Sequence, residues 1–183
     1  MVKYLQKISL NREKQEETRM LHLYWGDGKE KTTAAIDLAL RALGHGQRVS
    51  VVQFLKDGTS GKIALLRRCG AAVRCCSNAK FSWLMTDDEK AAAWADNTAA
   101  LQAALAEPFD LQVLDEACAA CKNNLVDEQL LKDAAARAKT VEVVFTGRTP
   151  AAWMQDAADY STEMRAVKHP YAQGITAREG VEY

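Results

Sequence analysis

The sequence predicts an α/β protein with a mostly parallel sheet of about five to six strands and helices on both faces. Short apolar runs alternate with longer segments of helical periodicity, and the alternation opens with a strand–helix–strand unit. At 183 residues, 48% of them hydrophobic, the chain can bury one substantial core but is short for two domains. We therefore expect one domain over 20–183, preceded by a charged leader over 1–19 that is mobile or helical.

The first elements form the strand–helix–strand unit. The apolar run 20–24 predicts a buried strand, and a Gly- and Lys-rich turn follows it at once. Apolar side chains then recur at the helical spacing i, i+3, i+4 and i+7, at Ile36, Ala39, Leu40 and Leu43. Gly44 and Gly46 mark the end of this helix. The run 48–54 predicts a second strand, parallel to the first through a right-handed crossover.

The rest of the chain continues the alternation. We expect further strands at 72–76, 111–114, 141–146 and 160–164. We expect further helices near 62–68, from Thr86 to a break at 107–110, over 127–138, and from 150 to about 158. Such alternation is typical of a doubly wound sheet.

Two of these helices carry start signals. A capping box at Thr86 and Glu89 opens the longest one. One face of that helix is expected to consist of Trp94, Thr98, Leu101 and Leu105. Thr149 followed by Pro150 predicts an N-cap and a first-turn proline for the last helix.

Composition narrows the class of partner. The chain has 24 Lys and Arg against 24 Asp and Glu, so no net charge favours nucleic acid or an anionic membrane. Neither a secretory signal nor a membrane-spanning run is evident, which predicts a cytoplasmic protein without nucleic-acid or membrane partners. Cys118 and Cys121 have metal or redox spacing, but the sequence offers no second pair and no suitably spaced histidine. Reduced thiols are therefore favoured.

The strongest local signal is the segment GDGKEKTT at 26–33, between a predicted strand and a predicted helix. Backbone amides and a helix N-terminus at this place face a bound phosphate. Lys31 is expected to contact phosphate oxygens, and the Thr32 hydroxyl is expected to reach Mg²⁺. The alternative for this segment alone is an ordinary polar turn.

A second signal is the acidic pair Asp115 and Glu116 at the end of a short apolar strand. In an open parallel sheet this end points toward the crevice beside the phosphate loop, so either carboxylate can hold the metal or its water. Taken alone, an acidic residue after a strand is often only a helix cap. Together with the phosphate loop, the pair predicts a nucleotide site.

Taken in order, these segments closely resemble the P-loop ATP:corrinoid adenosyltransferases. The likeness begins at 26–35, 44–46 and 51–54, and continues at Phe81-Ser82-Trp83, 113–116 and 146–148. It is most specific near the C-terminus, at 162–165, 167–170, 174–175 and 180–183. The resemblance covers almost all of the chain after the leader.

The resemblance implies a definite reaction. Co(I) of a corrinoid such as cobalamin attacks C5′ of ATP, the 5′-deoxyadenosyl group moves to cobalt, and triphosphate leaves. The protein supplies no nucleophile, so Lys31, Thr32 and Glu116 act by positioning. A homodimer and a flavoprotein or other reductant are implied as partners.

The resemblance also implies residue roles. The ATP contacts are Gly26, Asp27, Gly28, Lys29, Lys31, Thr32, Thr33 and Arg41. The Mg²⁺ contacts are Thr32 and Glu116, with Asp115 as a further candidate. Phe81, Trp83 and Arg148 are expected to contact corrinoid or phosphate. By spacing alone, an aromatic pair such as Phe81 and Trp83 is more often part of the core.

Glu30 departs from the family pattern, which has glycine before the lysine. Its carboxylate repels phosphate unless it points to solvent or pairs with a neighbouring lysine. One alternative is therefore a family member that binds corrinoid or nucleotide with little or no transfer. Another is an unrelated P-loop ATPase or kinase, which would release ADP or transfer a phosphoryl group.

Overall fold

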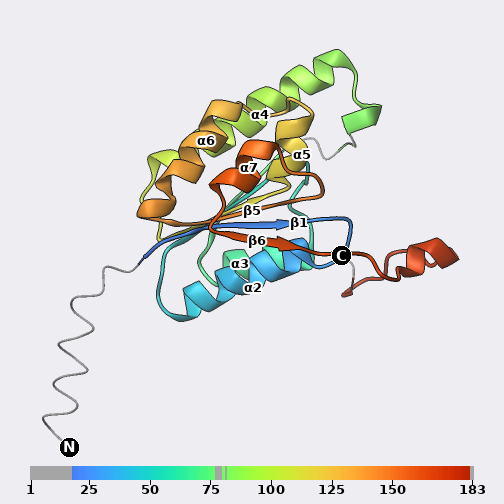
Figure 1. Cartoon of the computed structure of the whole chain (residues 1–183), viewed down its shortest axis with the longest axis horizontal. Coiled ribbons are helices and arrows are strands. Elements are labelled where there is room, and N and C mark those ends of the chain that lie inside the picture. Colours follow the sequence, from blue (N-terminus) through green and yellow to red (C-terminus); the bar gives the residue numbers. More distant parts are fainter. Residues whose placement is uncertain (1–17, 77–79, 81, 182–183) are drawn as a thin grey trace, which may run out of the picture.

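The computed structural model describes residues 18–76, 80 and 82–181. Within them lies a six-stranded sheet in the order β3-β2-β4-β5-β1-β6, and every neighbouring pair is parallel. Its strands are β1 (Leu21–Trp25), β2 (Val49–Gln53), β3 (Ala72–Cys75), β4 (Leu111–Asp115), β5 (Glu142–Gly147) and β6 (Tyr160–Glu163). The predicted parallel α/β architecture is confirmed (Figure 1).

Helices cover both faces of the sheet (Figure 1). One face is covered by α2 (Lys31–Gly44) and α3 (Gly61–Arg68). The other is covered by α4 (Asp87–Ala106), α5 (Ala117–Lys122), α6 (Glu128–Ala136) and α7 (Ala152–Ala157). Short 3-10 turns are η1 (Ser82–Leu84), η2 (Arg137–Lys139) and η3 (Pro170–Gln173). Among the described residues, no helix combines the length and apolar character that crossing a bilayer requires.

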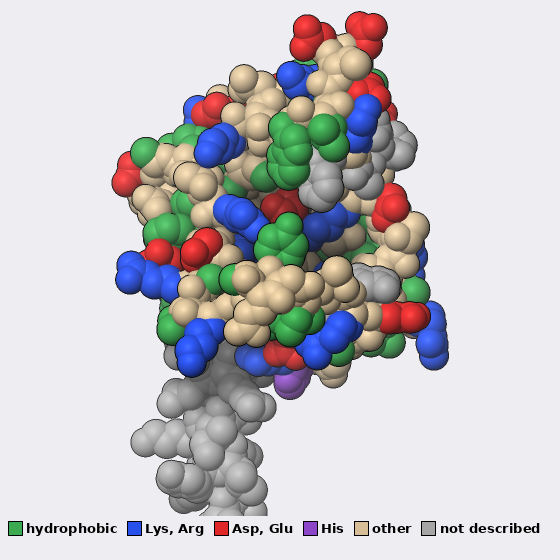
Figure 2. Space-filling model, turned by 90° about the vertical axis from the view of Figure 1, so that its right-hand side faces the viewer, with side chains coloured by type: hydrophobic (Ala, Val, Ile, Leu, Met, Phe, Trp, Pro, Cys, Tyr) green, Lys and Arg blue, Asp and Glu red, His purple; other side chains and the backbone are tan. Residues whose placement is uncertain are grey.

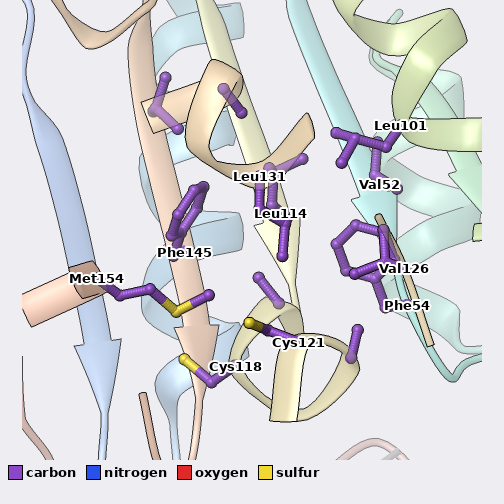
Figure 3. Packing of buried hydrophobic residues seen from close by; sticks show 14 of the residues in the cluster. Val52, Phe54, Leu101, Leu114, Cys118, Cys121, Val126, Leu131, Phe145 and Met154 are labelled. Carbon is purple, nitrogen blue, oxygen red and sulfur yellow. The ribbon is translucent and has the colours of Figure 1, made fainter. Parts of the chain in front are cut away.

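The central strands are buried on both sides, since every residue of β2 and β4 is buried. On the α4–α7 side, Phe145 and Met154 pack with the sulfur atoms of Cys118 and Cys121 in one apolar cluster (Figure 3). Burial raises the pKa of the Cys118 thiol to about 12 and also raises that of Cys121. Thiols with raised pKa values in an apolar core are poor nucleophiles and poor metal ligands.

Helix α4 begins as predicted, and its fully buried stripe is offset from the predicted apolar face. The capping box is formed, with Thr86 Oγ1 accepting from the Glu89 amide and the Glu89 carboxylate accepting from the Thr86 amide. Of the predicted face of Trp94, Thr98, Leu101 and Leu105, only Leu101 belongs to the fully buried stripe, which consists of Ala93, Asn97, Leu101 and Ala104. Small side chains allow close approach to the sheet, and the buried Asn97 amide donates to the Leu125 carbonyl at 2.8 Å.

Two further corrections concern short helices. Helix α7 begins after Ala151, so Thr149 is not its N-cap and Pro150 is not in its first turn. The fully buried Met154 side chain fixes this helix against the core and outweighs the local capping signal. Helix α5 was not predicted. Residues 1–17 of the predicted leader over 1–19, and Phe81, lie outside the described residues.

Candidate functional site

A cavity of about 600 Å³ opens at the carboxyl edge of the sheet. Because the strands are parallel, the loops that follow β1, β2, β4 and β5 meet at this edge and supply its walls. Figure 2 looks onto this side of the molecule and shows basic side chains gathered around a hollow with an acidic side chain between them. The cavity thus combines cationic walls with an anionic floor.

The loop after β1 is fastened by the chain segment that follows β6. The Gly28 amide donates to the Met164 carbonyl at 2.7 Å, and Asp27 Oδ1 accepts from the Ala166 amide at 3.1 Å. A Cβ atom at Gly26 or Gly28 would lie 2.3 or 2.7 Å from the Met164 carbonyl oxygen. Both glycines are therefore required for this backbone approach, whatever else the loop contacts.

Glu30 holds the conformation that glycine would adopt more easily. Its φ is 81° and its ψ is 5°, in the left-handed region, immediately before α2. Its carboxylate forms an ion pair with Lys29 at 2.9 Å, and both side chains are partly exposed. Pairing with a neighbouring lysine is one of the two arrangements, with pointing to solvent, in which the loop tolerates a carboxylate.

The first turn of α2 lies beside the cavity, which Lys31, Thr32 and Thr33 line. The Ala34 amide donates to the Glu30 carbonyl at 2.8 Å, so the amides of 31–33 precede the first hydrogen bond of the helix. Lys31 Nζ donates to the Gly28 carbonyl at 2.5 Å, which folds its side chain back over the loop. Burial, more than any neighbouring charge, lowers the pKa of Lys31. The amides at the start of α2 and the Lys31 side chain both suit a bound anion.

Asp115 at the end of β4 is the centre of the floor. Its side chain is fully buried. It accepts hydrogen bonds from Thr32 Oγ1 at 2.8 Å, Thr146 Oγ1 at 2.7 Å, Gln53 Nε2 at 2.9 Å and Lys56 Nζ at 2.8 Å. Burial alone would raise the pKa of Asp115, but the Lys56 ammonium and the donated hydrogen bonds outweigh it and lower that pKa. The carboxylate is therefore ionised.

Glu116 and Lys56 complete the polar cluster. Glu116 has a φ of 62°, and its amide donates to Thr146 Oγ1 at 2.9 Å. Lys56 Nζ lies 3.6 Å from Glu116 Oε1 and 3.2 Å from Thr32 Oγ1. Burial would lower the pKa of Lys56, but Asp115 and Glu116 together raise it. Lys56 was missed from sequence, although its place just beyond β2, at the same edge as Asp115, is a signal for it.

The other predicted residues are divided among several places. Arg148 lines the cavity, as do Lys29, Thr33 and His169. Arg41 lies in the last turn of α2, where it forms an exposed ion pair with Asp37 at 3.5 Å and does not line the cavity. Trp83 is 75% exposed, so it is not a core residue. It borders a second hollow, of about 680 Å³, together with Trp94.

Comparisons with known proteins cover nearly the whole chain. The family model for the ATP:corrinoid adenosyltransferases BtuR/CobO/CobP matches residues 17–183. A corrinoid adenosyltransferase of Pseudomonas aeruginosa is 38% identical over 173 residues, which span 92% of this chain and 85% of the relative. The corrinoid adenosyltransferase CobA of Salmonella typhimurium is 36% identical over 180 residues, which span 92% of this chain and 88% of the relative. One from Escherichia coli is 33% identical over 174 residues, spanning 92% and 88%.

Proposed function

We propose, because this chain belongs to the ATP:corrinoid adenosyltransferase family, that the cavity at the carboxyl edge of the sheet binds the triphosphate of ATP. The chain is a transferase that moves the 5′-deoxyadenosyl group of ATP to the cobalt of a corrinoid. Its substrates are ATP and a corrinoid. The two alternatives, a binding protein without transfer and an unrelated ATPase or kinase, are not favoured.

One observation carries the proposal for the ATP site. Five basic side chains line one cavity together with the first turn of α2: Lys29, Lys31, Lys56, Lys62 and Arg148. In the reaction an electron pair of Co(I) forms the bond to C5′, the C5′–O bond breaks, and its electron pair leaves on triphosphate. Cations and amide dipoles that face the leaving group stabilise the charge that develops there. The protein therefore works by positioning and charge, without a nucleophile of its own.

Mg²⁺ is the metal that the donor set fits. Thr32 Oγ1 and the carboxylates of Asp115 and Glu116 surround one cationic position, at present filled by Lys56 Nζ. Hydroxyl and carboxylate oxygens with phosphate oxygens are the usual Mg²⁺ ligands, and Mg²⁺ neutralises phosphate charge. Among the described residues no group of three His, Cys, Asp or Glu is placed to hold a metal unaided, which agrees with a metal brought in by phosphate.

Trp83 is the residue best placed to contact the corrinoid. A tryptophan that is 75% exposed offers a large apolar face, and the corrin ring is a large, partly apolar partner. An apolar face beside the ring favours loss of the lower axial ligand, which makes Co(II) easier to reduce. Phe81 is proposed for the same face by resemblance alone.

The proposed partners follow from the reaction and the surface. Co(I) requires a reductant, for which a flavoprotein is the proposed class. Apolar side chains are exposed along the segment after β6, at Val167, Tyr171 and Ile175, which supports a homodimer in which a second copy covers them. The cytoplasm, where reduced thiols and ATP are both available, is the proposed location.

Anaerobic transfer assays with and without Mg²⁺ test the assignment of the site. Reduced cobalamin and ATP are incubated with the parent protein, Thr32→Val and Thr59→Val, and formation of the cobalt–carbon bond is followed by absorbance. Thr59 is the matched control, because its hydroxyl lines the same cavity but bonds to Asp57 at 2.8 Å. We expect Thr32→Val to lose on the order of tenfold to a hundredfold in rate and Thr59→Val to retain it. Equal rates for the three proteins would refute the site.

A further inference from the structure

Lys56 occupies the position that a metal ion needs. Its ammonium lies 2.8 Å from Asp115 Oδ2, 3.2 Å from Thr32 Oγ1 and 3.6 Å from Glu116 Oε1. These are the three side chains that form the proposed metal site. A metal ion and this ammonium cannot fill one position at the same time.

The cluster requires a cation even without substrate. Asp115 is fully buried and accepts four hydrogen bonds, one of them from the Lys56 ammonium, and a buried carboxylate is unstable unless an opposite charge compensates it. The hydroxyl and amide donors of Thr32, Thr146 and Gln53 supply hydrogen bonds but no positive charge. Lys56 is therefore the counter-ion of Asp115 in the ligand-free protein.

Lys56 is also able to leave. Its side chain is 33% exposed and lines the cavity, in contrast to the wholly buried side chain of Asp115. The four-carbon stem of a lysine lets its ammonium move by several ångströms without a change in the backbone. An ammonium displaced into the cavity faces the space that a triphosphate would fill.

We propose that Lys56 is a resident counter-ion that blocks the metal position until a nucleotide arrives, so that the metal enters only together with phosphate. The proposal rests on the proposed function and adds that the binding of metal is coupled to the binding of nucleotide. Metal displaces the Lys56 ammonium from Asp115, and the phosphate oxygens of the nucleotide accept hydrogen bonds from the displaced ammonium. Metal alone offers Lys56 no such new partner, so metal alone binds poorly.

Metal binding without nucleotide tests this coupling. Mn²⁺ serves as the probe, and bound Mn²⁺ is counted by electron paramagnetic resonance in the parent protein, Lys56→Met and Lys62→Met. Lys62 is the matched control, since it lines the same cavity and its removal also deletes one positive charge, but it interacts with Asp115 through its charge and not through a hydrogen bond. We expect Lys56→Met to bind one Mn²⁺ at least about tenfold more tightly than the parent, and Lys62→Met to stay within about threefold of it.

A stability measurement covers the case in which Lys56→Met folds poorly. Removal of the ammonium leaves Asp115 uncompensated, so the variant is expected to unfold at a lower temperature than the parent without metal. Mn²⁺ should restore its melting temperature while changing that of the parent little. Unchanged Mn²⁺ affinity in Lys56→Met, an equal gain in Lys62→Met, or a Lys56→Met protein that fails to fold even with Mn²⁺ would each overturn the proposal. Neither readout uses ATP or corrinoid, so such a result would leave the transferase assignment standing.

Discussion

Replacement of Glu30 by glycine tests the least conventional residue of the phosphate loop. Glu30 holds a φ of 81°, and a left-handed conformation costs a non-glycine residue roughly 1–2 kcal/mol. Glycine relieves this cost but adds about 0.5–1 kcal/mol of unfolded-state entropy. Loss of the partly exposed ion pair with Lys29 removes about 0–1 kcal/mol. The free energy of unfolding should therefore change by no more than about 1.5 kcal/mol.

The affinity for MgATP should rise in the same variant. Glu30 lines the cavity, but its side chain is 48% exposed, so water screens its charge. Two unit charges about 8 Å apart in water interact by about 0.5 kcal/mol. Repulsion from two phosphate charges then comes to about 1 kcal/mol, which corresponds to roughly fivefold in the dissociation constant.

Calorimetric titration with MgATP measures the effect, and Glu30→Gln separates its two causes. The glutamine variant loses the charge but keeps the strained backbone, so it should gain affinity without relief of strain. A gain in Glu30→Gly alone would assign the effect to the backbone. Parent-like or weaker binding in both variants would refute the reasoning, because the Glu30 carboxylate would then exert no repulsion on phosphate.

Three further changes test the structural account. Gly28→Ala should lower the free energy of unfolding by about 1–3 kcal/mol because the added Cβ meets the Met164 carbonyl. Gly44→Ala is the control, since its Cβ meets no atom within 4 Å, and equal melting temperatures of the two variants would contradict the close packing of the loop against Met164. Asp115→Asn should cost about 1–3 kcal/mol in urea unfolding because the asparagine amide nitrogen cannot accept the hydrogen bonds that a buried carboxylate oxygen accepts there, and a parent-like midpoint would show that these bonds are dispensable. Trp83→Ala should change stability by less than about 0.5 kcal/mol yet raise the KM for corrinoid, and parallel losses of stability and ATP affinity would place Trp83 in the core.

The parts of the proposed site that were predictable are those whose residues are neighbours in the sequence. The turn at 26–33 between a strand and a helix, and the acidic pair at the end of β4, each indicate the proposed phosphate or metal site through local chemistry. Lys56 and Met164 could not be assigned in this way. The parallel sheet brings distant loops to one edge, and only there does Lys56 reach Asp115 and the Met164 carbonyl reach the Gly28 amide.

The fold was predictable from periodicity except where packing outweighs it. The parallel sheet and the buried face of α2 follow from alternating apolar segments, but the buried face of α4 does not. Asn97 is polar but buried, because its side-chain amide donates a hydrogen bond to the Leu125 carbonyl. A hydrophobic pattern does not reveal such a distant hydrogen-bond partner, so Asn97 was not expected on the buried face.

The identity of the phosphate product tests the central claim most directly. Under anaerobic conditions, reduced cobalamin and MgATP are mixed with the protein, and the phosphate products are resolved by phosphorus magnetic resonance while the cobalt–carbon bond is followed by absorbance. Adenosyl transfer predicts one intact triphosphate for each cobalt–carbon bond formed. Release of ADP or orthophosphate as the primary product, without a cobalt–carbon bond, would contradict the account.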